Sequence, residues 1–221
     1  NCNSYEFFNK TIFENNIAYS SKNYACGGAI SDFYSSNAIK SYFYSNDVLD
    51  QCNFINNTAY SKLYDVFGGA FSHISSSAGT NDFQKGIFNE CIFSNNNAYS
   101  ISNSSYGGAF SFRKLLYGSF NNCTFYNNTA ETFLDIYLYE GDEPSSLGGA
   151  IYLENSYIEY DNCFFINNTG YGNATKHIST GKGGAIFSEK SFNKIHNSTF
   201  INNTLCNYGL KYDIDCYING G

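Results

Sequence analysis

The chain is short of residues that several classes of protein depend on. Among its 221 residues there are one proline, no methionine and no tryptophan, and only 14% of the residues are charged. Lysine and arginine together number 12 against 19 aspartates and glutamates, and the only arginine is Arg113. Proteins that bind nucleic acids or anionic membranes do so through a basic surface. We therefore expect neither as a partner.

Long apolar runs are also missing. No stretch approaches the ~20 apolar residues that a transmembrane helix needs, so we expect no membrane insertion. The chain begins at Asn1 without a basic and apolar leader, which we interpret as a mature or excised fragment whose targeting segment has been removed. Its eight cysteines lack Cys-x-x-Cys spacing, which favours an oxidising compartment over zinc sites. We expect a secreted or cell-surface protein without metal or other cofactor.

Aromatic residues, in contrast, are plentiful. Tyrosine and phenylalanine contribute 21 residues each, or 19% of the chain, which gives ample apolar surface for a folded core and excludes a disordered chain. No change of composition marks a boundary between two cores. The sequence predicts one domain over residues 1–221, either a whole protein or one unit of a longer tandem or head-to-tail array.

Two short motifs alternate along the chain. Phe-x-Asn-Asn occurs six times, and Gly-Gly-Ala followed by Ile or Phe occurs five times. The first motif begins at Phe13, Phe54, Phe93, Phe125, Phe165 and Phe200, and the second at Gly27, Gly68, Gly107, Gly148 and Gly183. Internal repeats of this length are typical of stacked, solenoid architectures.

The segments between the motifs indicate which solenoid to expect. They are rich in β-branched and aromatic residues, carry Gly, Asn and Ser at their corners and show no helical period, as short strands do. The sequence predicts an all-β, right-handed parallel β-helix of about six coils. Because the motif interval varies, we expect long surface loops at about 31–50, 72–86, 131–147 and 170–182.

The alternation of Gly-Gly-Ala-(Ile/Phe) with Phe-x-x-Asn resembles the repeat of the polymorphic outer membrane proteins, over about residues 13 to 203. These are adhesins and autotransporter passengers. The resemblance implies right-handed β-helix coils and an adhesive role at a cell surface.

Each motif residue has a predicted structural role. The motif phenylalanines should point inward and stack from coil to coil. The second asparagine of each motif should stand at a corner in the left-handed conformation and bond to the amides above and below it. The glycine pair lets the backbone turn with positive φ and approach its neighbour closely. A Gly28→Val change in the pair, or an Ala150→Leu change at the small residue that follows the pair, should therefore disrupt a coil. The expected asparagine ladder comprises Asn16, Asn57, Asn96, Asn128, Asn168 and Asn203.

Nine Asn-x-Ser/Thr sequons predict N-linked glycans in a secreted protein. They lie at Asn9, Asn56, Asn103, Asn122, Asn127, Asn167, Asn173, Asn197 and Asn202. The four sequons inside the repeat have an alternative interpretation, because threonine after the corner could simply favour the turn. Period-2 alternation would turn these four asparagines outward, where glycans on adjacent coils would be crowded.

Four of the eight cysteines stand two residues before a motif phenylalanine, which predicts an inward-facing column of thiols. They are Cys52, Cys91, Cys123 and Cys163. Free thiols and bridges between Cys52 and Cys91 and between Cys123 and Cys163 both remain open, because stacked strands bring the Cα atoms within range but align the side chains. The other candidate disulfides are Cys206–Cys216 and Cys2–Cys26.

A polysaccharide-active β-helix enzyme is the competing hypothesis. Lyases need a strong base beside carboxylates, and hydrolases need two or three convergent carboxylates. Asp213 and Asp215, and likewise Glu140 and Asp142, would share a strand face, but neither pair recurs on the next coil. The three histidines, isolated in the sequence, are His73, His177 and His196. We predict no catalytic residues and no enzyme activity.

The motif count also bears on assembly. Six Phe-x-Asn-Asn elements have five Gly-Gly-Ala partners, and the chain ends in Gly220-Gly221 without a recognisable cap. Uncapped solenoids expose unpaired strand edges. The sequence therefore predicts copies of the chain stacked head to tail into a glycosylated structural fibre, with a fragment of a surface adhesin as the alternative.

Overall fold

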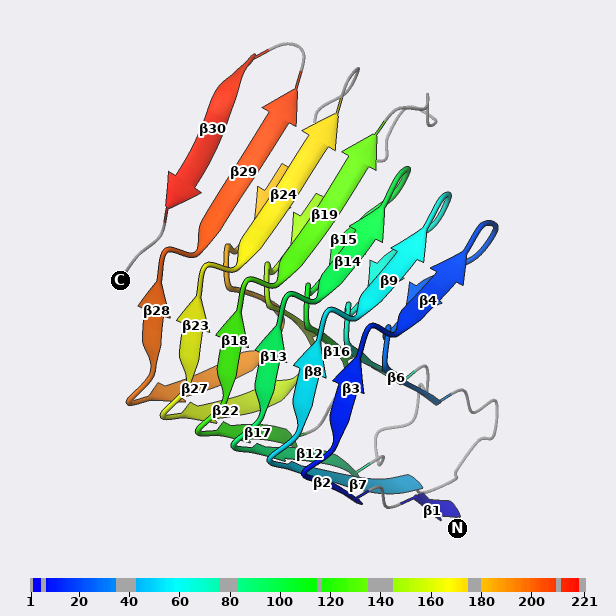
Figure 1. Cartoon of the computed structure of the whole chain (residues 1–221), viewed down its shortest axis with the longest axis vertical. Coiled ribbons are helices and arrows are strands. Elements are labelled where there is room, and N and C mark those ends of the chain that lie inside the picture. Colours follow the sequence, from blue (N-terminus) through cyan, green and yellow to red (C-terminus); the bar gives the residue numbers. More distant parts are fainter. Residues whose placement is uncertain are drawn as a thin grey trace.

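The computed structural model describes residues 2–4, 7–34, 43–75, 83–114, 117–134, 145–174, 180–209 and 212–218. All regular structure in these ranges is β, and the strands stack into a parallel β-solenoid (Figure 1). The predicted fold class is confirmed. Within the same ranges no helix is long and apolar enough to cross a membrane.

Five stacked sheets, which we name A to E, run along the solenoid. Sheet A consists of β1 (Cys2–Ser4), β2 (Phe7–Asn9), β7 (Phe43–Asp50), β12 (Phe83–Asn89), β17 (Tyr117–Asn121), β22 (Tyr157–Asp161) and β27 (Phe192–His196). Sheet B consists of β3 (Ile12–Glu14), β8 (Asn53–Ile55), β13 (Ile92–Ser94), β18 (Thr124–Tyr126), β23 (Phe164–Ile166) and β28 (Thr199–Ile201).

Sheet C holds the long strands that dominate one side of Figure 1. It consists of β4 (Ile17–Ser20), β9 (Thr58–Ser61), β14 (Asn97–Ser100), β19 (Thr129–Leu134), β24 (Thr169–Ala174), β29 (Thr204–Gly209) and β30 (Tyr212–Ile218). Sheet D consists of β5 (Ala25–Cys26), β10 (Val66–Phe67), β15 (Ser105–Tyr106), β20 (Ser145–Leu147) and β25 (Thr180–Lys182). Sheet E consists of β6 (Ile30–Tyr34), β11 (Phe71–Ser75), β16 (Phe110–Arg113), β21 (Ile151–Glu154) and β26 (Ile186–Glu189).

We number the levels of the solenoid 1 to 6 by the six strands of sheet B, from β3 to β28. Each level holds one Phe-x-Asn-Asn motif in strict register, so that Phe13 pairs with Phe54 and the pattern continues to Phe200. The stacked rings lie 4.6 to 4.9 Å apart. The predicted inward column of phenylalanines is therefore present.

The core is filled by this aromatic column and by the rings that meet it at right angles. Phe93 is fully buried and packs edge-to-face on Phe110 at 4.5 Å, while Phe88 and Phe120 stack on each other at 4.5 Å. Stacked and edge-to-face pairs are the favoured aromatic geometries and add to the stabilisation from burial. A smaller cluster of Ala25, Ala59, Val66 and Ala98 fills the space beside sheets C and D.

The glycine pairs do what their sequence predicts. The first glycine has positive φ, as at Gly107 with 66°. The second leaves no space for a side chain, because a Cβ at Gly108 would lie 2.2 Å from the carbonyl oxygen of Gly149. Glycine is therefore required at both positions, for conformation at one and for space at the other.

The predicted corner conformation was assigned to the wrong asparagine. Positive φ occurs at the first asparagine of the motif and not at the second. A residue that turns the corner points outward, so the ladder residue after it points inward, where it must be for its bonds. The first asparagines are Asn15, Asn56, Asn95, Asn127, Asn167 and Asn202, with φ between 51° and 57°.

The predicted long loops are shorter than expected, because strands occupy their margins. β6 extends to Tyr34, β7 begins at Phe43, and strands of sheets C, D and E likewise enter the other three excursions. The remaining parts, 35–42, 76–82, 135–144 and 175–179, lie outside the described residues.

The expectation of an uncapped end was wrong for sheet C. β30 folds back antiparallel on β29, with Thr204 opposite Ile218 and Cys206 opposite Cys216. Figure 1 shows β30 at the outer edge of the sheet. It takes the place where the next parallel strand would pair. No repeat or motif predicts this strand, and Gly220-Gly221 lies outside the described residues.

Candidate functional site

The second asparagines of the motif form a continuous ladder of hydrogen bonds along the inside of one corner. The Asn57 side-chain Nδ2 donates to Asn96 Oδ1 at 3.0 Å, and the Asn57 backbone N donates to the same oxygen at 3.0 Å. Asn57 Nδ2 also donates to the Phe13 carbonyl oxygen at 2.9 Å. The same set of bonds recurs through Asn96, Asn128 and Asn168 to the last member.

This ladder uses every polar atom of its inner members. Asn57, Asn96, Asn128 and Asn168 are fully buried. Because their amides are satisfied by neighbouring coils, burial costs little and any other side chain would leave donors without partners. The ladder is a device for holding coils together, and it leaves no free group for ligand binding.

The four inner cysteines stack as free, buried thiols at the opposite end of the sheet B strands from this ladder. Each Sγ lies within hydrogen-bond distance of two carbonyl oxygens, which share its single hydrogen. Cys91 Sγ, for example, lies 3.4 Å from the Leu49 oxygen and 3.2 Å from the Asn89 oxygen. Of the two alternatives left open by the sequence, the structure contains the thiol column and not the bridges Cys52–Cys91 and Cys123–Cys163.

The thiols of this column are expected to react slowly. Burial raises the pKa of Cys123 well above its ordinary value and also raises the pKa of Cys52, whereas hydrogen bonding with Cys123 lowers the pKa of Cys91 and of Cys163. All four thiols are fully buried, and thiols that reagents cannot reach react slowly with oxidants and metals. The column is therefore part of the packing and not a redox or metal centre.

The other candidate disulfides involve cysteines outside this column. Cys26 is a free thiol on β5, so the candidate Cys2–Cys26 bridge is absent, and burial raises the pKa of Cys26 to about 11. Cys206 and Cys216 face each other across the β29–β30 pair. Directly opposed antiparallel residues have Cα atoms within disulfide range, so the sequence prediction for this pair stands as a prediction.

The sequons lie where the sequence placed them, on the surface. None of the nine asparagines is buried. Asn56, Asn127, Asn167 and Asn202 have positive φ at the corner after sheet B, whereas Asn122 and Asn197 have it at the corner before sheet B. Six of the nine therefore flank one sheet, and levels 4 and 6 carry one on each side.

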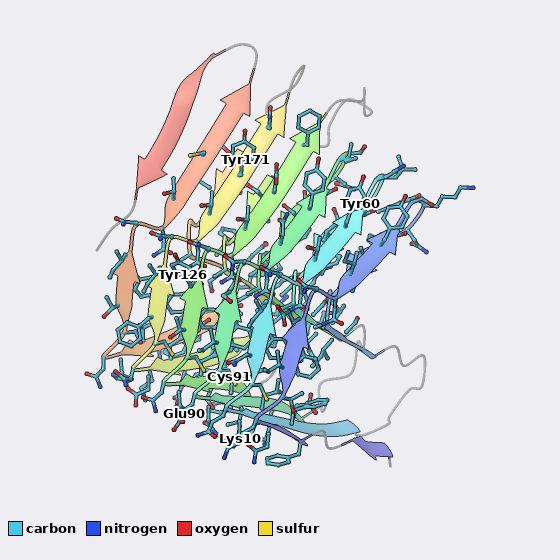
Figure 2. The ribbon with its side chains drawn as sticks, viewed as in Figure 1. Lys10, Tyr60, Glu90, Cys91, Tyr126 and Tyr171 are labelled. Atoms are coloured by element: carbon cyan, nitrogen blue, oxygen red, sulfur yellow. The ribbon has the colours of Figure 1, made fainter. Side chains whose placement is uncertain are left out.

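The outer face of sheet C carries an aromatic column that the motif analysis did not identify. Tyr19, Tyr60 and Tyr99 occupy successive levels in register, with ring centroids 5.3 Å apart. Glu131 and Tyr171 continue the column. Figure 2 shows Tyr60 and Tyr171 projecting from the long strands. A repeated Ala-Tyr-Ser after the first three motifs is the sequence signal that could have revealed it.

We call this set, Tyr19, Tyr60, Tyr99, Glu131 and Tyr171, the tyrosine face. Burial raises the pKa of Tyr99, and the charge of Glu131 raises it further. Burial also raises the pKa of Glu131. The face therefore combines flat, half-buried aromatic surface with hydroxyl donors and one carboxylate that is partly desolvated, a combination suited to holding polar ligands such as sugars or peptides.

A second mixed cluster lies where sheets D and E meet. Arg113 forms an ion pair with Glu154, and its guanidinium carbon lies 5.1 Å from the centroid of the Phe67 ring. Burial, together with the nearby Asp65 charge, raises the pKa of Tyr106 to about 12. Because Phe67 is only 3% exposed, this cluster fills the angle between the sheets and offers little surface.

Within the part of the chain that the structure describes, the candidate catalytic groups do not converge. Among the described residues no three His, Cys, Asp or Glu side chains come together as a metal site. His73 is buried in the core, and His196 is exposed on β27. Asp213 and Asp215 lie on β30, while Glu140, Asp142 and His177 lie outside the described residues.

Comparison with known families identifies one relationship. Two segments, residues 122–154 and 162–189, match the Chlamydia polymorphic membrane protein repeat. Each match begins at the corner asparagine before sheet B, Asn122 or Asn162, and ends with the strand of sheet E, so each covers one coil without its sheet A strand. No curated protein and no solved structure matched the chain.

The family resemblance drawn from the motifs is thus confirmed on levels 4 and 5 of the solenoid. It supports a surface-exposed, passenger-like β-solenoid and agrees with the expected place at a cell surface.

Proposed function

We propose that the chain is a non-catalytic adhesive scaffold, displayed outside the cell, that binds its partners through the tyrosine face. One observation carries this proposal. The side chains of the two repeated motifs make the contacts between coils. The residue types at the outward positions beside them, in contrast, differ between levels. At one outward position of sheet C the series reads Tyr19, Tyr60, Tyr99, Glu131 and Tyr171.

A scaffold with a constant interior and variable outer columns can change its ligand without changing its fold. Three rings of the tyrosine face, Tyr19, Tyr60 and Tyr99, pack on one another, so little conformational entropy is lost when a ligand covers them. The chemistry fits glycans or glycoproteins, which combine apolar ring faces with hydroxyl groups.

Binding to immobilised glycans and glycoproteins tests this proposal. The double variant Tyr60→Ala, Tyr99→Ala should weaken binding at least about tenfold, as expected for loss of two anchor residues. Tyr126→Ala, which removes an exposed tyrosine from sheet B (Figure 2), is the matched control and should leave binding unchanged. Equal loss in both variants, or in neither, contradicts the assignment of the tyrosine face.

The enzyme alternative has its own decisive outcome. Turnover of an acidic polysaccharide that a single Asp→Asn change abolishes would replace the adhesive proposal. Purified chain incubated with such polysaccharides should release no unsaturated or reducing ends.

N-glycosylation belongs to the proposal as a finer point. It is supported by the nine surface sequons, six of which flank sheet B. Another, Asn173, lies on β24 of sheet C with its Nδ2 3.5 Å from the Tyr171 hydroxyl, so a glycan there would border the tyrosine face. Intact mass measured before and after glycosidase treatment tests it, and an unshifted mass removes it. Crowding at Asn127, Asn167 and Asn202, on adjacent levels, predicts incomplete occupancy there.

End-to-end stacking into a fibre is a second proposal, favoured by a specific observation. Among the described residues, the asparagine ladder stops with hydrogen-bonding atoms of Asn16 and Asn203 that have no partner. Electron micrographs should show filaments with an axial repeat near ~30 Å, the height of six stacked strands. Isolated short rods under all conditions would contradict the fibre, whether β30 stays paired with β29 or separates from it.

A further inference from the structure

The two ends of the asparagine ladder are complementary. Asn203 accepts at Oδ1 from the Asn168 backbone N at 3.0 Å and Nδ2 at 2.9 Å, and its Nδ2 donates to the Phe165 oxygen at 2.8 Å. Within the described residues its backbone N and the second hydrogen of its amide have no acceptor. At the other end, Asn16 donates to Asn57 Oδ1 while its own Oδ1 receives no donor from the described residues.

The unused atoms match in kind and number. If Asn16 of a second copy stood one level beyond Asn203, its Oδ1 would accept from the Asn203 backbone N and Nδ2. Its spare amide hydrogen would reach the Phe200 oxygen, as Asn203 reaches Phe165. These are the three bonds that every inner step of the ladder makes.

The aromatic column ends in the same way. Phe13 and Phe200 each stack on one neighbour at 4.6 Å and are half-buried, whereas the four rings between them have no exposed surface. Contact between the ends would cover both rings and extend the core by the spacing it already has. The coil-to-coil interface inside the chain is therefore a template for an interface between copies.

Strand β30 blocks this contact between the two ends. Every strand pair among the described residues is parallel except β29–β30. β30 occupies the edge of β29 that β4 of a second copy would need, and Ile218 pairs with Thr204, the residue directly after Asn203. Asn203 is accordingly 2% exposed although it ends the ladder, while Asn16 is exposed.

We propose that the level 1 end of the solenoid, with Asn16 and Phe13 at its centre, docks onto the level 6 end of a second copy, and that β30 is a strap that must leave β29 first. This inference rests on the proposed end-to-end assembly and adds its surfaces and its control. The contact is heterologous, so repeated docking gives a filament.

Pairing of β30 with β29 explains why copies of the chain need not polymerise at once through their apolar, hydrogen-bonding ends. β30 satisfies the β29 edge within the chain, and an intramolecular strand is favoured over one from a second copy at low concentration. Among the described strands none pairs with the outer edges of β27 and β28, so release of β30 opens sheets A, B and C at level 6 for docking. Sheets D and E end one level earlier, with β25 and β26, and take no part in this contact.

Sedimentation velocity and electron microscopy of the full chain over a wide concentration range test the proposal. Tyr217→Pro removes a backbone donor from the β29–β30 pair without touching any coil. It should raise end-to-end assembly at least about tenfold over the unmodified chain. A second variant that ends after Gly209 should do the same, which guards against a fold defect peculiar to proline.

Asn16→Ala in the Tyr217→Pro background is the test of the docking surface. Loss of the Asn16 acceptor and donor should lower assembly at least about tenfold, back toward the unmodified chain. Lys114→Ala, an exposed corner change after the central strand β16 and away from both ends, should have no effect.

The outcomes separate the two proposals. If the unmodified chain assembles as strongly as the strap variants, the strap is wrong and the fibre stands. If the strap variants stay single while hydrogen exchange shows β30 released, both the docking surface and the fibre are wrong. If Asn16→Ala leaves assembly unchanged, the ladder end is not the docking surface. Adhesion through the tyrosine face is measured separately and is unaffected by all three.

Discussion

The inner levels 2 to 5 and the end levels 1 and 6 carry the same motif in different surroundings. At the position two residues before the motif phenylalanine, the inner levels have cysteine, whereas level 1 has Thr11 and level 6 has Ser198. All make the same contact. Thr11 Oγ1 donates to the Asn9 oxygen at 3.0 Å, Ser198 Oγ to the His196 oxygen at 2.7 Å, and Cys91 Sγ to the Asn89 oxygen at 3.2 Å.

This difference shows how the choice of side chain follows burial. A thiol is weakly polar and suits a dry core, while a hydroxyl suits a position that water reaches from one side. The ends are therefore adapted to be wetter than the interior, although they keep the motif that stacks the coils. Four predictions test this contrast.

The largest effect is expected at the second glycine of the Gly-Gly-Ala motif. A Cβ at Gly149 would lie 2.0 Å from the Gly184 oxygen, so Gly149→Ala must displace backbone and should cost more than about 4 kcal/mol of unfolding free energy. At Gly184, in the last such motif, the nearest atom is 2.8 Å away, and Gly184→Ala should cost clearly less. Urea unfolding measures both, and equal costs would contradict the contrast.

The ladder gives the next largest effect. Asn96→Ala leaves the Asn57 backbone N and one Asn57 Nδ2 hydrogen buried without an acceptor, and it removes the Nδ2 bonds of Asn96 to the Asn128 and Phe54 oxygens. The change should cost about 3 to 5 kcal/mol. Asn16→Ala removes a bond at an exposed end and should cost about 1 kcal/mol. Thermal and urea unfolding of the two variants provide the comparison. An Asn16 variant as damaged as the Asn96 variant would mean that the end is already covered.

Much of this contrast could be predicted from the sequence, for a physical reason. Residues that must satisfy a stacked neighbour recur at every level, so the phenylalanine column, the identity of the ladder asparagines and the cysteine column were all readable. The corner before sheet B was not, because Lys10, Gln51, Glu90, Asn122, Asn162 and Asn197 share positive φ without sharing a residue type.

The sequence was wrong or silent where contacts do not repeat. The positive φ was assigned to the ladder asparagine because both motif asparagines are invariant along the chain, and only the backbone shows which one turns. β30 was missed because it occurs once and pairs antiparallel, so no periodicity announces it. The tyrosine face was missed because its series is interrupted by Glu131.

The thiol column predicts a smaller effect on stability, larger in the core than at the end of the solenoid. Cys91→Ser puts a hydroxyl in the dry core, where the Leu49 and Asn89 oxygens still accept its hydrogen bond, and should cost about 1 to 2 kcal/mol. Ser198→Cys, at the wetter end, should change stability by less than about 0.5 kcal/mol. Denaturant unfolding under reducing conditions measures the pair. A stabilising Cys91→Ser variant would refute the account of burial.

The smallest effect concerns the lateral surface and its pH dependence. Burial raises the pKa of Glu131, so its ionised form is less stable in the fold than in the unfolded chain. Its contribution to stability is therefore greatest below the unfolded pKa of about 4.3 and falls as pH rises through the raised folded pKa.

Glu131→Gln should accordingly stabilise the fold at pH 7 by less than about 1 kcal/mol, and the gain should vanish near pH 4. Unfolding curves at the two pH values measure it. The exposed Glu14→Gln is the control and should show little change at either pH. A gain for Glu131→Gln that persists at acid pH would assign the effect to something other than charge.

Hydrogen–deuterium exchange resolved by level tests the central claim most directly, because it reports how firmly each coil is held by its neighbours. The account predicts the slowest exchange at the backbone amides of Asn57, Asn96 and Asn128, which bond to the next ladder side chain, with faster exchange at levels 1 and 6. Fast exchange at these three amides, or protection that is uniform from Asn16 to Asn203 in the isolated chain, would contradict it.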